Sequence, residues 1–214
     1  FEVTTLAQDI TPDAFDITNM SNQALNTAVT TNTVTVAGMN EVATASTTVG
    51  TLVKNGTDTG LTSTTVVDGD TLAVKVTTSG TPSDVINGSL TVGTFSDNFS
   101  ITNVGPDTTP DAFVFTDVTG ATKSTIYTSN VLTIAGLNTA APIAVTGGEY
   151  RINGGAWTAV SGTVNNGQTV EVRLTSSASD NTKVTATLTI GGVSDDFDVT
   201  TETPSLPADL GVTF

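Results

Sequence analysis

The sequence predicts an all-β fold in which two Greek-key β-sandwiches follow one another, with extra strands at the ends of the chain. Apolar and polar residues alternate over short runs that turn residues separate, which is the pattern of half-buried strands. No apolar stripe with helical spacing persists over two turns, so helices are not expected. A stretch of about 100 residues occurs twice, and this length matches one sandwich domain.

The repeat is defined by motifs that recur at one constant spacing. Residues 9–15 (Asp-Ile-Thr-Pro-Asp-Ala-Phe) recur as residues 107–113 (Asp-Thr-Thr-Pro-Asp-Ala-Phe), 98 positions later. Residues 33–40 (Thr-Val-Thr-Val-Ala-Gly-Met-Asn) recur as residues 131–138 (Val-Leu-Thr-Ile-Ala-Gly-Leu-Asn) at the same spacing. The two copies align without a gap, so we expect two modules of one fold.

The ends of the chain are out of phase with these modules. Residues 1–5 (Phe-Glu-Val-Thr-Thr) match residues 99–103 and 197–201, which are predicted to form the last strand of each copy. Residues 211–214 (Gly-Val-Thr-Phe) predict another short strand. The predicted organisation is a spare N-terminal strand (1–5), a first repeat (6–104), a second repeat (105–201) and a C-terminal tail or strand (202–214).

Turn signals separate the strands within each copy. In the second copy, Asn153-Gly154-Gly155 between residues 150–152 and 156–158 is the strongest hairpin signal, because a type I′ turn needs positive φ angles. Asn55-Gly56 takes the same place in the first copy. We expect seven to eight strands per copy, with the following residues pointing inward: Leu72, Val74, Val76, Leu90, Val92, Val170, Val172, Leu174, Val184, Ala186, Leu188 and Ile190.

The second copy carries a resemblance to a known family. Residues 148–157 (Gly-Glu-Tyr-Arg-Ile-Asn-Gly-Gly-Ala-Trp), 162–170 and 187–192 resemble the bacterial immunoglobulin-like tandem repeats of large secreted cell-surface and adhesin proteins. The first copy departs from the pattern, because residues 51–56 (Thr-Leu-Val-Lys-Asn-Gly) lack the aromatic residue and the double glycine. The resemblance implies immunoglobulin-like sandwiches and an extracellular, cell-surface location, but no common ligand.

The composition excludes several function classes. A net charge of −15 opposes nucleic-acid binding, which depends on neutralising phosphates with basic residues. The absence of His and Cys excludes the Ser-His-Asp and Cys-His catalytic machineries and the usual zinc sites. No run of 18 apolar residues exists, so no membrane insertion is expected. Glycoside hydrolysis needs an aromatic-lined cleft, and only 5% of the residues are aromatic, so we expect no enzyme.

Carboxylates near the predicted domain boundaries are candidate calcium ligands. Ca²⁺ takes six to eight oxygen ligands, and a junction between sandwich modules could supply them. The alternative is that these are ordinary turn residues whose side chains accept hydrogen bonds from nearby backbone amides. The candidate residues are Asp9, Asp13, Asp107, Asp111, Asp195 and Asp196.

Two aromatic residues of the second copy are candidates for glycan binding. Tyr150 and Trp157 lie on the same predicted hairpin and could stack on a sugar ring. The alternative is that one of these side chains fills the core of the sandwich. Both interpretations stay open at the level of the sequence.

The spare strands suggest self-association. An unpaired strand exposes a row of backbone donors and acceptors, and adding a strand to the sheet edge of a neighbour satisfies them. Phe1, Val3, Val212 and Phe214 are therefore candidate assembly contacts. We expect a structural subunit of an extracellular bacterial surface filament or layer, assembling into a homopolymer by strand donation. The alternative is a segment of a longer array in a large adhesin, acting beside neighbouring repeats as a stalk or a glycan- or matrix-binding module.

Overall fold

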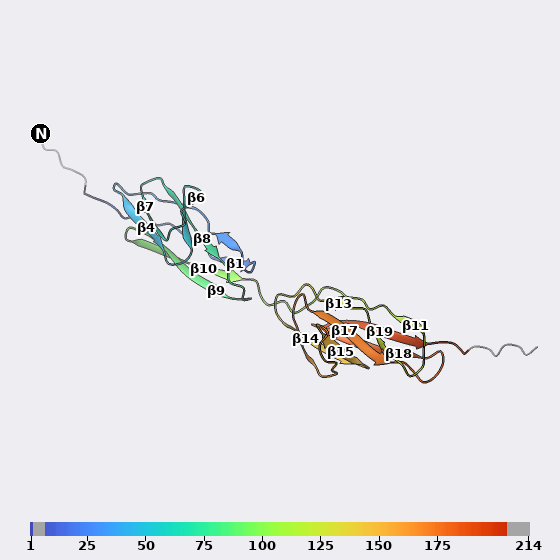
Figure 1. The fold of residues 1–214 in the computed structure, drawn as a ribbon. Helices are drawn as coiled ribbons and strands as arrows, with labels where there is room; N and C mark the ends of the chain where they lie inside the picture. Colours follow the sequence, from blue (N-terminus) through green and yellow to red (C-terminus); the bar gives the residue numbers. More distant parts are fainter. Residues whose placement is uncertain (2–6, 205–214) are drawn as a thin grey trace, which may run out of the picture. The chain divides into compact units, whose positions relative to one another are not determined.

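The computed structural model describes residue 1 and residues 7–204, and the chain divides into two compact units, Phe1–Gly105 and Pro106–Phe214 (Figure 1). Within these described residues the structure contains nineteen strands and no helix. The prediction of an all-β fold is therefore confirmed. No helix among the described residues is long and apolar enough to cross a membrane.

The first unit consists of two sheets. One has the strand order β1-β10-β9-β4-β7, and the other has the order β2-β8-β5-β6, with β3 also pairing with β8. The strands are β1 (Met20–Gln23), β2 (Ala28–Thr30), β3 (Val34–Thr35), β4 (Ala43–Thr47), β5 (Thr51–Lys54), β6 (Thr57–Asp58), β7 (Ser63–Val66), β8 (Thr71–Thr77), β9 (Val85–Val92) and β10 (Phe95–Asn103).

The second unit repeats this arrangement. Its sheets have the orders β11-β19-β18-β14-β16 and β12-β17-β13, with β15 on the other side of β17. The strands are β11 (Val118–Ala121), β12 (Ile126–Thr128), β13 (Leu132–Thr133), β14 (Ala141–Thr146), β15 (Glu149–Ile152), β16 (Gly162–Val164), β17 (Thr169–Thr175), β18 (Lys183–Ile190) and β19 (Val193–Thr201).

The strand count per unit exceeds the predicted seven to eight, partly because one long strand is interrupted. In the first unit β2 and β3 both pair with β8, and the Thr31 amide between them donates to the Val74 carbonyl at 2.9 Å. In the second unit the Ser129 amide bridges β12 and β13 to Val172 in the same way. The short runs are therefore segments of one strand.

The core of each unit lies between its two sheets. In the first unit, fully buried Leu72 and Val74 come from one sheet, and fully buried Leu90 and Ile101 come from the other. The predicted inward residues are buried in both units, except that Val184 is only partly buried and packs against the core. Strand alternation therefore located the core correctly.

Both predicted hairpin turns adopt the expected backbone conformation. Asn153 and Gly154 have φ angles of 50° and 68°, and Asn55 and Gly56 have φ angles of 51° and 77°. In the second unit the return segment forms a single bridge from Thr158 to Tyr150 rather than a strand. The hairpin prediction is confirmed, with a shorter second arm than expected.

The first and last strands of each unit lie side by side and run parallel. β1 pairs with β10 through Met20 opposite Ile101 and Gln23 opposite Asn103. β11 pairs with β19 in the same register, with Val118 opposite Val199. The chain therefore enters and leaves each sandwich through adjacent strands of one sheet.

The segment that precedes the first strand crosses the last hairpin at close range. A Cβ atom at Gly191 would lie 1.8 Å from the Thr108 carbonyl oxygen, and one at Gly93 would lie 2.0 Å from that of Ile10. Both glycines also have positive φ angles. Only glycine allows this crossing, because any side chain would displace the backbone that passes over it.

We expect Gly191→Ala to lower the free energy of unfolding by more than about 2 kcal/mol, because it adds a backbone clash to a strained φ angle. Gly192→Ala is the matched control, since Gly192 has a φ of 90° but open space around it, with nothing within 4 Å of the place that a Cβ atom would take. The control should cost about 1 kcal/mol. Urea unfolding of both variants measures the difference, and equal losses would contradict the crossing.

Candidate functional site

The N-terminal segment of each unit is held to its sandwich mainly by side-chain hydrogen bonds. We call residues 7–19 and 107–117 the straps. In the first strap, Asn40 Oδ1 accepts from the Asp9 amide at 2.7 Å and Asn40 Nδ2 donates to the Ala7 carbonyl at 2.8 Å. In the second strap, Asn138 Oδ1 accepts from the Asp107 amide at 2.6 Å. Both straps therefore begin at the same kind of anchor.

Carboxylates of the last strand hold the middle of each strap. Asp97 Oδ2 accepts from the Ile17 amide at 2.7 Å, and Asp195 Oδ2 accepts from the Phe115 amide at 2.6 Å. Ile17 and Phe115 are 2% and 5% exposed. Because a buried amide without a partner is costly, these carboxylates satisfy a need of the fold.

The candidate calcium ligands are distributed along this anchoring system. Asp9 Oδ1 accepts from the Thr11 amide and Asp107 Oδ1 from the Thr109 amide, each at 2.9 Å. Asp196 Oδ1 accepts from the Thr187 hydroxyl at 2.5 Å. The contacts of Asp9 and Asp107 are of the kind that the turn-residue alternative predicted, whereas that of Asp196 is a cross-strand contact between β18 and β19.

Asp13 and Asp111 complete the set and occupy equivalent positions in the two straps. Their amides donate to the Ala37 and Ala135 carbonyls at 2.7 and 2.9 Å. Across residue 1 and residues 7–204, no three Asp or Glu side chains come together in a way that could hold a metal ion. Calcium binding by the candidate residues stays a prediction, which a melting curve with and without chelator would test.

The sequence did not single out the asparagines that anchor the straps. Asn40 and Asn138 recur at the repeat spacing, as do Asn32 and Asn130, which accept from the Thr18 and Thr116 amides at 2.8 Å. Their recurrence at the repeat spacing was the feature of the sequence that could have identified them. Their role was hidden because an anchor can be recognised only when its partner segment, far away in the chain, is placed beside it.

We expect Asp195→Ala to lower the free energy of unfolding by about 1 to 3 kcal/mol, because the buried Phe115 amide loses its acceptor. Asp196→Ala removes the neighbouring carboxylate, which is exposed and accepts from the Thr187 hydroxyl, and should change stability by less than about 0.5 kcal/mol. Chemical denaturation of the two variants distinguishes an anchor from a general effect of negative charge.

A second group of carboxylate contacts lies at the turn before β8. Asp70 is 8% exposed and accepts from Asn55 Nδ2 at 2.8 Å, from the Val67 amide at 2.9 Å and from Lys54 Nζ at 2.9 Å. The hydrogen bond from Asn55, with those from Lys54 and Val67, lowers the pKa of Asp70 from 3.8 to about 2. The ionised form is therefore favoured by folding.

This shift makes stability depend on pH. Because the folded pKa of Asp70 lies below its ordinary value of 3.8, its contribution is present above that value and is lost as the pH falls toward about 2. We expect the stability difference between the parent chain and Asp70→Asn to shrink by roughly 2 kcal/mol over this range. Denaturation at several pH values measures it, and a constant difference would contradict the shift.

The two candidate glycan-binding residues lie in different environments. Tyr150 is 3% exposed and belongs to the core, where its hydroxyl donates to the Val160 carbonyl at 2.9 Å. Burial raises the pKa of this hydroxyl. Tyr150 therefore offers no ring face to a ligand, whereas Trp157 is partly exposed.

Trp157 lies over both arginines of the chain. The guanidinium carbons of Arg151 and Arg173 are each 4.6 Å from the centre of its ring. Arg151 pairs with Glu171 through Nε at 2.7 Å and Nη2 at 3.0 Å, and Arg173 Nη2 pairs with Glu149 at 2.7 Å. These are cross-strand pairs of β15 and β17. The indole therefore lies over two ion pairs in which a glutamate balances the charge of each arginine.

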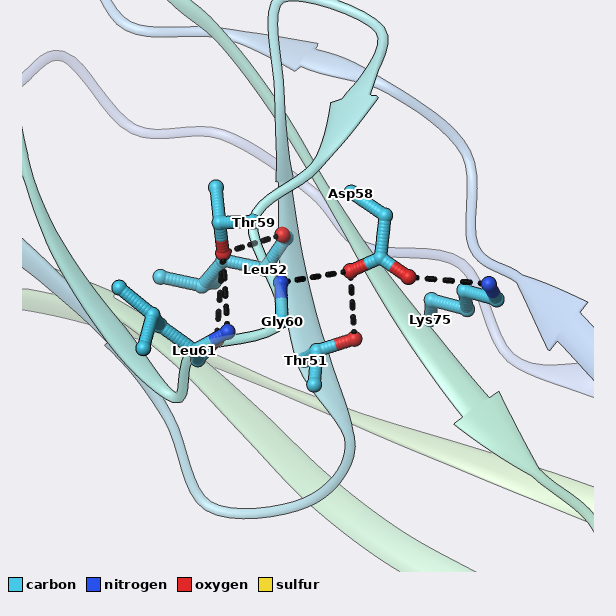
Figure 2. A network of polar contacts seen from close by, with 7 residues as sticks. All are labelled: Thr51, Leu52, Asp58, Thr59, Gly60, Leu61 and Lys75. Atoms are coloured by element: carbon cyan, nitrogen blue, oxygen red, sulfur yellow. Dashed lines mark hydrogen bonds and ion pairs between the residues drawn. The ribbon is translucent and has the colours of Figure 1, made fainter.

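The equivalent face of the first unit carries a different network (Figure 2). Asp58 accepts from Lys75 Nζ at 2.9 Å, from the Thr51 hydroxyl at 2.9 Å and from the Gly60 amide at 3.0 Å. The hydrogen bond from Lys75 contributes most to lowering the pKa of Asp58 to about 2. Thr59 stands at the position of Trp157, and its hydroxyl donates to the Leu52 carbonyl at 2.8 Å. The aromatic surface is thus specific to the second unit.

The candidate assembly strands lie almost wholly outside the described residues. Val3, Val212 and Phe214 are not among them, and Phe1 is exposed. The role of Phe1 and Val3 in assembly is therefore argued from the sequence match of residues 1–5 with β10 and β19, and that of Val212 and Phe214 from the short strand predicted at residues 211–214.

Comparison with known proteins finds similarity to solved structures alone. No family model matches the chain, and no curated protein matches it. The titin domains Z1Z2, solved in complex with telethonin, are 12% identical over 95% of this chain and 100% of that chain, with a TM-score of 0.48. Such identities concern the fold alone.

Two bacterial structures are also similar to the chain. The Yersinia pseudotuberculosis adhesin InvE is 12% identical over 86% of this chain, with a TM-score of 0.28, and InvD from the same organism is 15% identical over 92%, with a TM-score of 0.29. The chain spans 58% of the InvE chain, 60% of the InvD chain and 65% of the titin I9–I11 tandem. At these scores the likeness adds no argument to the observed strand order.

Proposed function

We propose that this chain is a non-enzymatic structural element of an extracellular bacterial surface filament or layer, and that its modules assemble by strand donation. The observation that carries the proposal is the parallel pairing of the first and last strands in each unit. A pull on the two ends of such a module loads the hydrogen bonds between these strands together, along the strand direction. A module of this kind suits a structure that has to transmit tension.

The side-chain chemistry supports a structural role. The chain contains no His or Cys. Among the described residues, the carboxylates of Asp97 and Asp195 accept from backbone amides of the straps, and no three carboxylates gather into a potential metal site. These polar groups are thus engaged in holding the fold together.

Strand donation is supported by the positions that the N-terminal residues would take. Phe1 and Val3 match Phe99 and Ile101 of β10, which are 3% and 0% exposed in the core of the first unit. A strand with this sequence carries the side chains that complete a sandwich core. When it pairs with a sheet of another copy, it also satisfies its own backbone donors and acceptors.

We expect Val3→Asp to abolish assembly into filaments or layers, because Val3 matches the buried Ile101, and a carboxylate there would be desolvated without a partner. Thr4→Asp is the matched control, since it adds the same charge at a position that matches the partly exposed Thr102. Electron microscopy of the purified parent should show filaments or layers that Thr4→Asp retains. A monodisperse parent, or filaments of Val3→Asp, would refute strand donation.

The second candidate function is a repeat of a large surface adhesin, acting as a stalk or binding a glycan. The partly exposed indole of Trp157, with two guanidinium groups beside it, is the observation that favours it. Binding to a glycan array that is lost in Trp157→Ala and retained in Thr59→Ala, at the equivalent position of the first unit, would support this function. An array without any bound glycan would remove the glycan-binding role and leave that of a stalk.

A further inference from the structure

β7 and β16 are equivalent strands at an outer edge of their sheets. In the second unit Ala141, Pro142 and Ile143 of β14 face Val164, Thr163 and Gly162 of β16. The Pro142 carbonyl accepts from the Gly191 amide at 2.9 Å, on the side of β14 away from β16. Because backbone groups alternate in direction along a strand, those of Gly162 and Val164 face β14. The amide and carbonyl of Thr163 therefore point outward, toward the open side.

The first unit covers the equivalent position. Thr44 of β4 faces Thr65 of β7, and the Thr44 carbonyl accepts from the Gly93 amide on the opposite side at 3.0 Å. The backbone groups of Thr65 thus point outward, and Lys54 Nζ donates to the Thr65 carbonyl at 2.9 Å. Lys54 belongs to β5 of the other sheet, and its ammonium group occupies the Thr65 carbonyl, so a strand that paired with β7 at this point would have to displace it.

The second unit lacks this protection. Ile152 stands at the position of Lys54, and within residues 7–204 no side chain donates to the Thr163 carbonyl. The segment that precedes β16 also has one charge fewer than its equivalent in the first unit, because Ala156 stands at the position of Asp58. The edge strand of the second unit is therefore uncharged and its outward carbonyl has no lysine cap.

The same segment differs in its exposed apolar side chains. Val160, which is 74% exposed, stands at the position of Thr62, and Trp157 stands at that of Thr59, whereas Ala159 stands at that of Leu61, which is 57% exposed. Exposed aromatic and aliphatic side chains beside paired arginines are typical of the core of a protein–protein interface. Val160 and Trp157 precede the uncapped edge strand in the chain, and they distinguish this segment of the second unit from its equivalent in the first.

We propose that β16 pairs antiparallel with β16 of a second copy of this chain. Residues 156–164 carry no charge in a chain with a net charge of −15, so two copies can meet here without the repulsion that acts over most of their surfaces. A two-fold axis uses the same edge twice, and the outward amide and carbonyl of Thr163 then face those of the partner's Thr163. Val160 and Trp157 lie in the same segment and add apolar contact.

Sedimentation analysis of the full chain over a range of concentrations tests this pairing. Thr163→Pro removes the outward amide and leaves the ladder with β14 intact, because proline is tolerated on an edge strand when its nitrogen faces solvent. We expect at least a tenfold loss in the self-association constant, equivalent to about 1.4 kcal/mol. Thr65→Pro, the equivalent change in the first unit, should associate as the parent does.

The same measurement distinguishes the pairing of β16 from strand donation by residues 1–5. Sedimentation of Val3→Asp should still show dimers, whereas Val3→Asp combined with Thr163→Pro should be monomeric. If Thr163→Pro fails to fold by circular dichroism, Val160→Lys serves instead, because it places a lysine on the exposed segment without touching the core. A Val3→Asp chain that is monomeric at every concentration, or one whose dimers withstand the edge substitution, would overturn the pairing.

Discussion

The hydrogen bonds that tie each strap to its sandwich are the interactions on which the rest of the structure depends. A strap has little ladder pairing of its own, yet it leads directly into the first strand, which pairs with the last one. Asp97 and Asp195 fix it at amides that are buried and would otherwise lack an acceptor. The parallel pairing, the closure of the core and the close crossing at Gly93 and Gly191 all require a strap in this position.

The sequence was informative where physical rules are local. Strand alternation located Leu72 and Leu188 in the core, and the Asn-Gly pairs located both type I′ turns. The sequence was less informative about polar residues. An aspartate such as Asp195 looks the same in the sequence whether its carboxylate binds calcium or accepts a hydrogen bond from a backbone amide. The hydrogen bond from the Phe115 amide to Asp195 joins residues 80 positions apart, and only the fold brings the two together. The same limit applied to Tyr150 and Trp157, which share a hairpin although only Tyr150 is buried.

The two modules share the residues that hold the straps and differ at positions on their outer faces. Anchors such as Asn40 and Asn138 are retained, since each strap needs them. Positions on the outer face have diverged, from Thr59 to Trp157 and from Lys54 to Ile152. The retained residues hold the backbone of the straps, and the diverged positions have no such contact in common. The differences between the modules are therefore where specific contacts with other molecules would arise, while the shared residues maintain the sandwich.

Native-state hydrogen exchange of the Ile17 and Phe115 amides tests the role of the straps most directly. If the carboxylates of Asp97 and Asp195 anchor the straps, both amides should exchange only through global unfolding, as slowly as amides in the centre of β8 and β17. Exchange at the rate of an exposed loop would contradict the account, because it would show that the straps detach while the sandwiches stay folded.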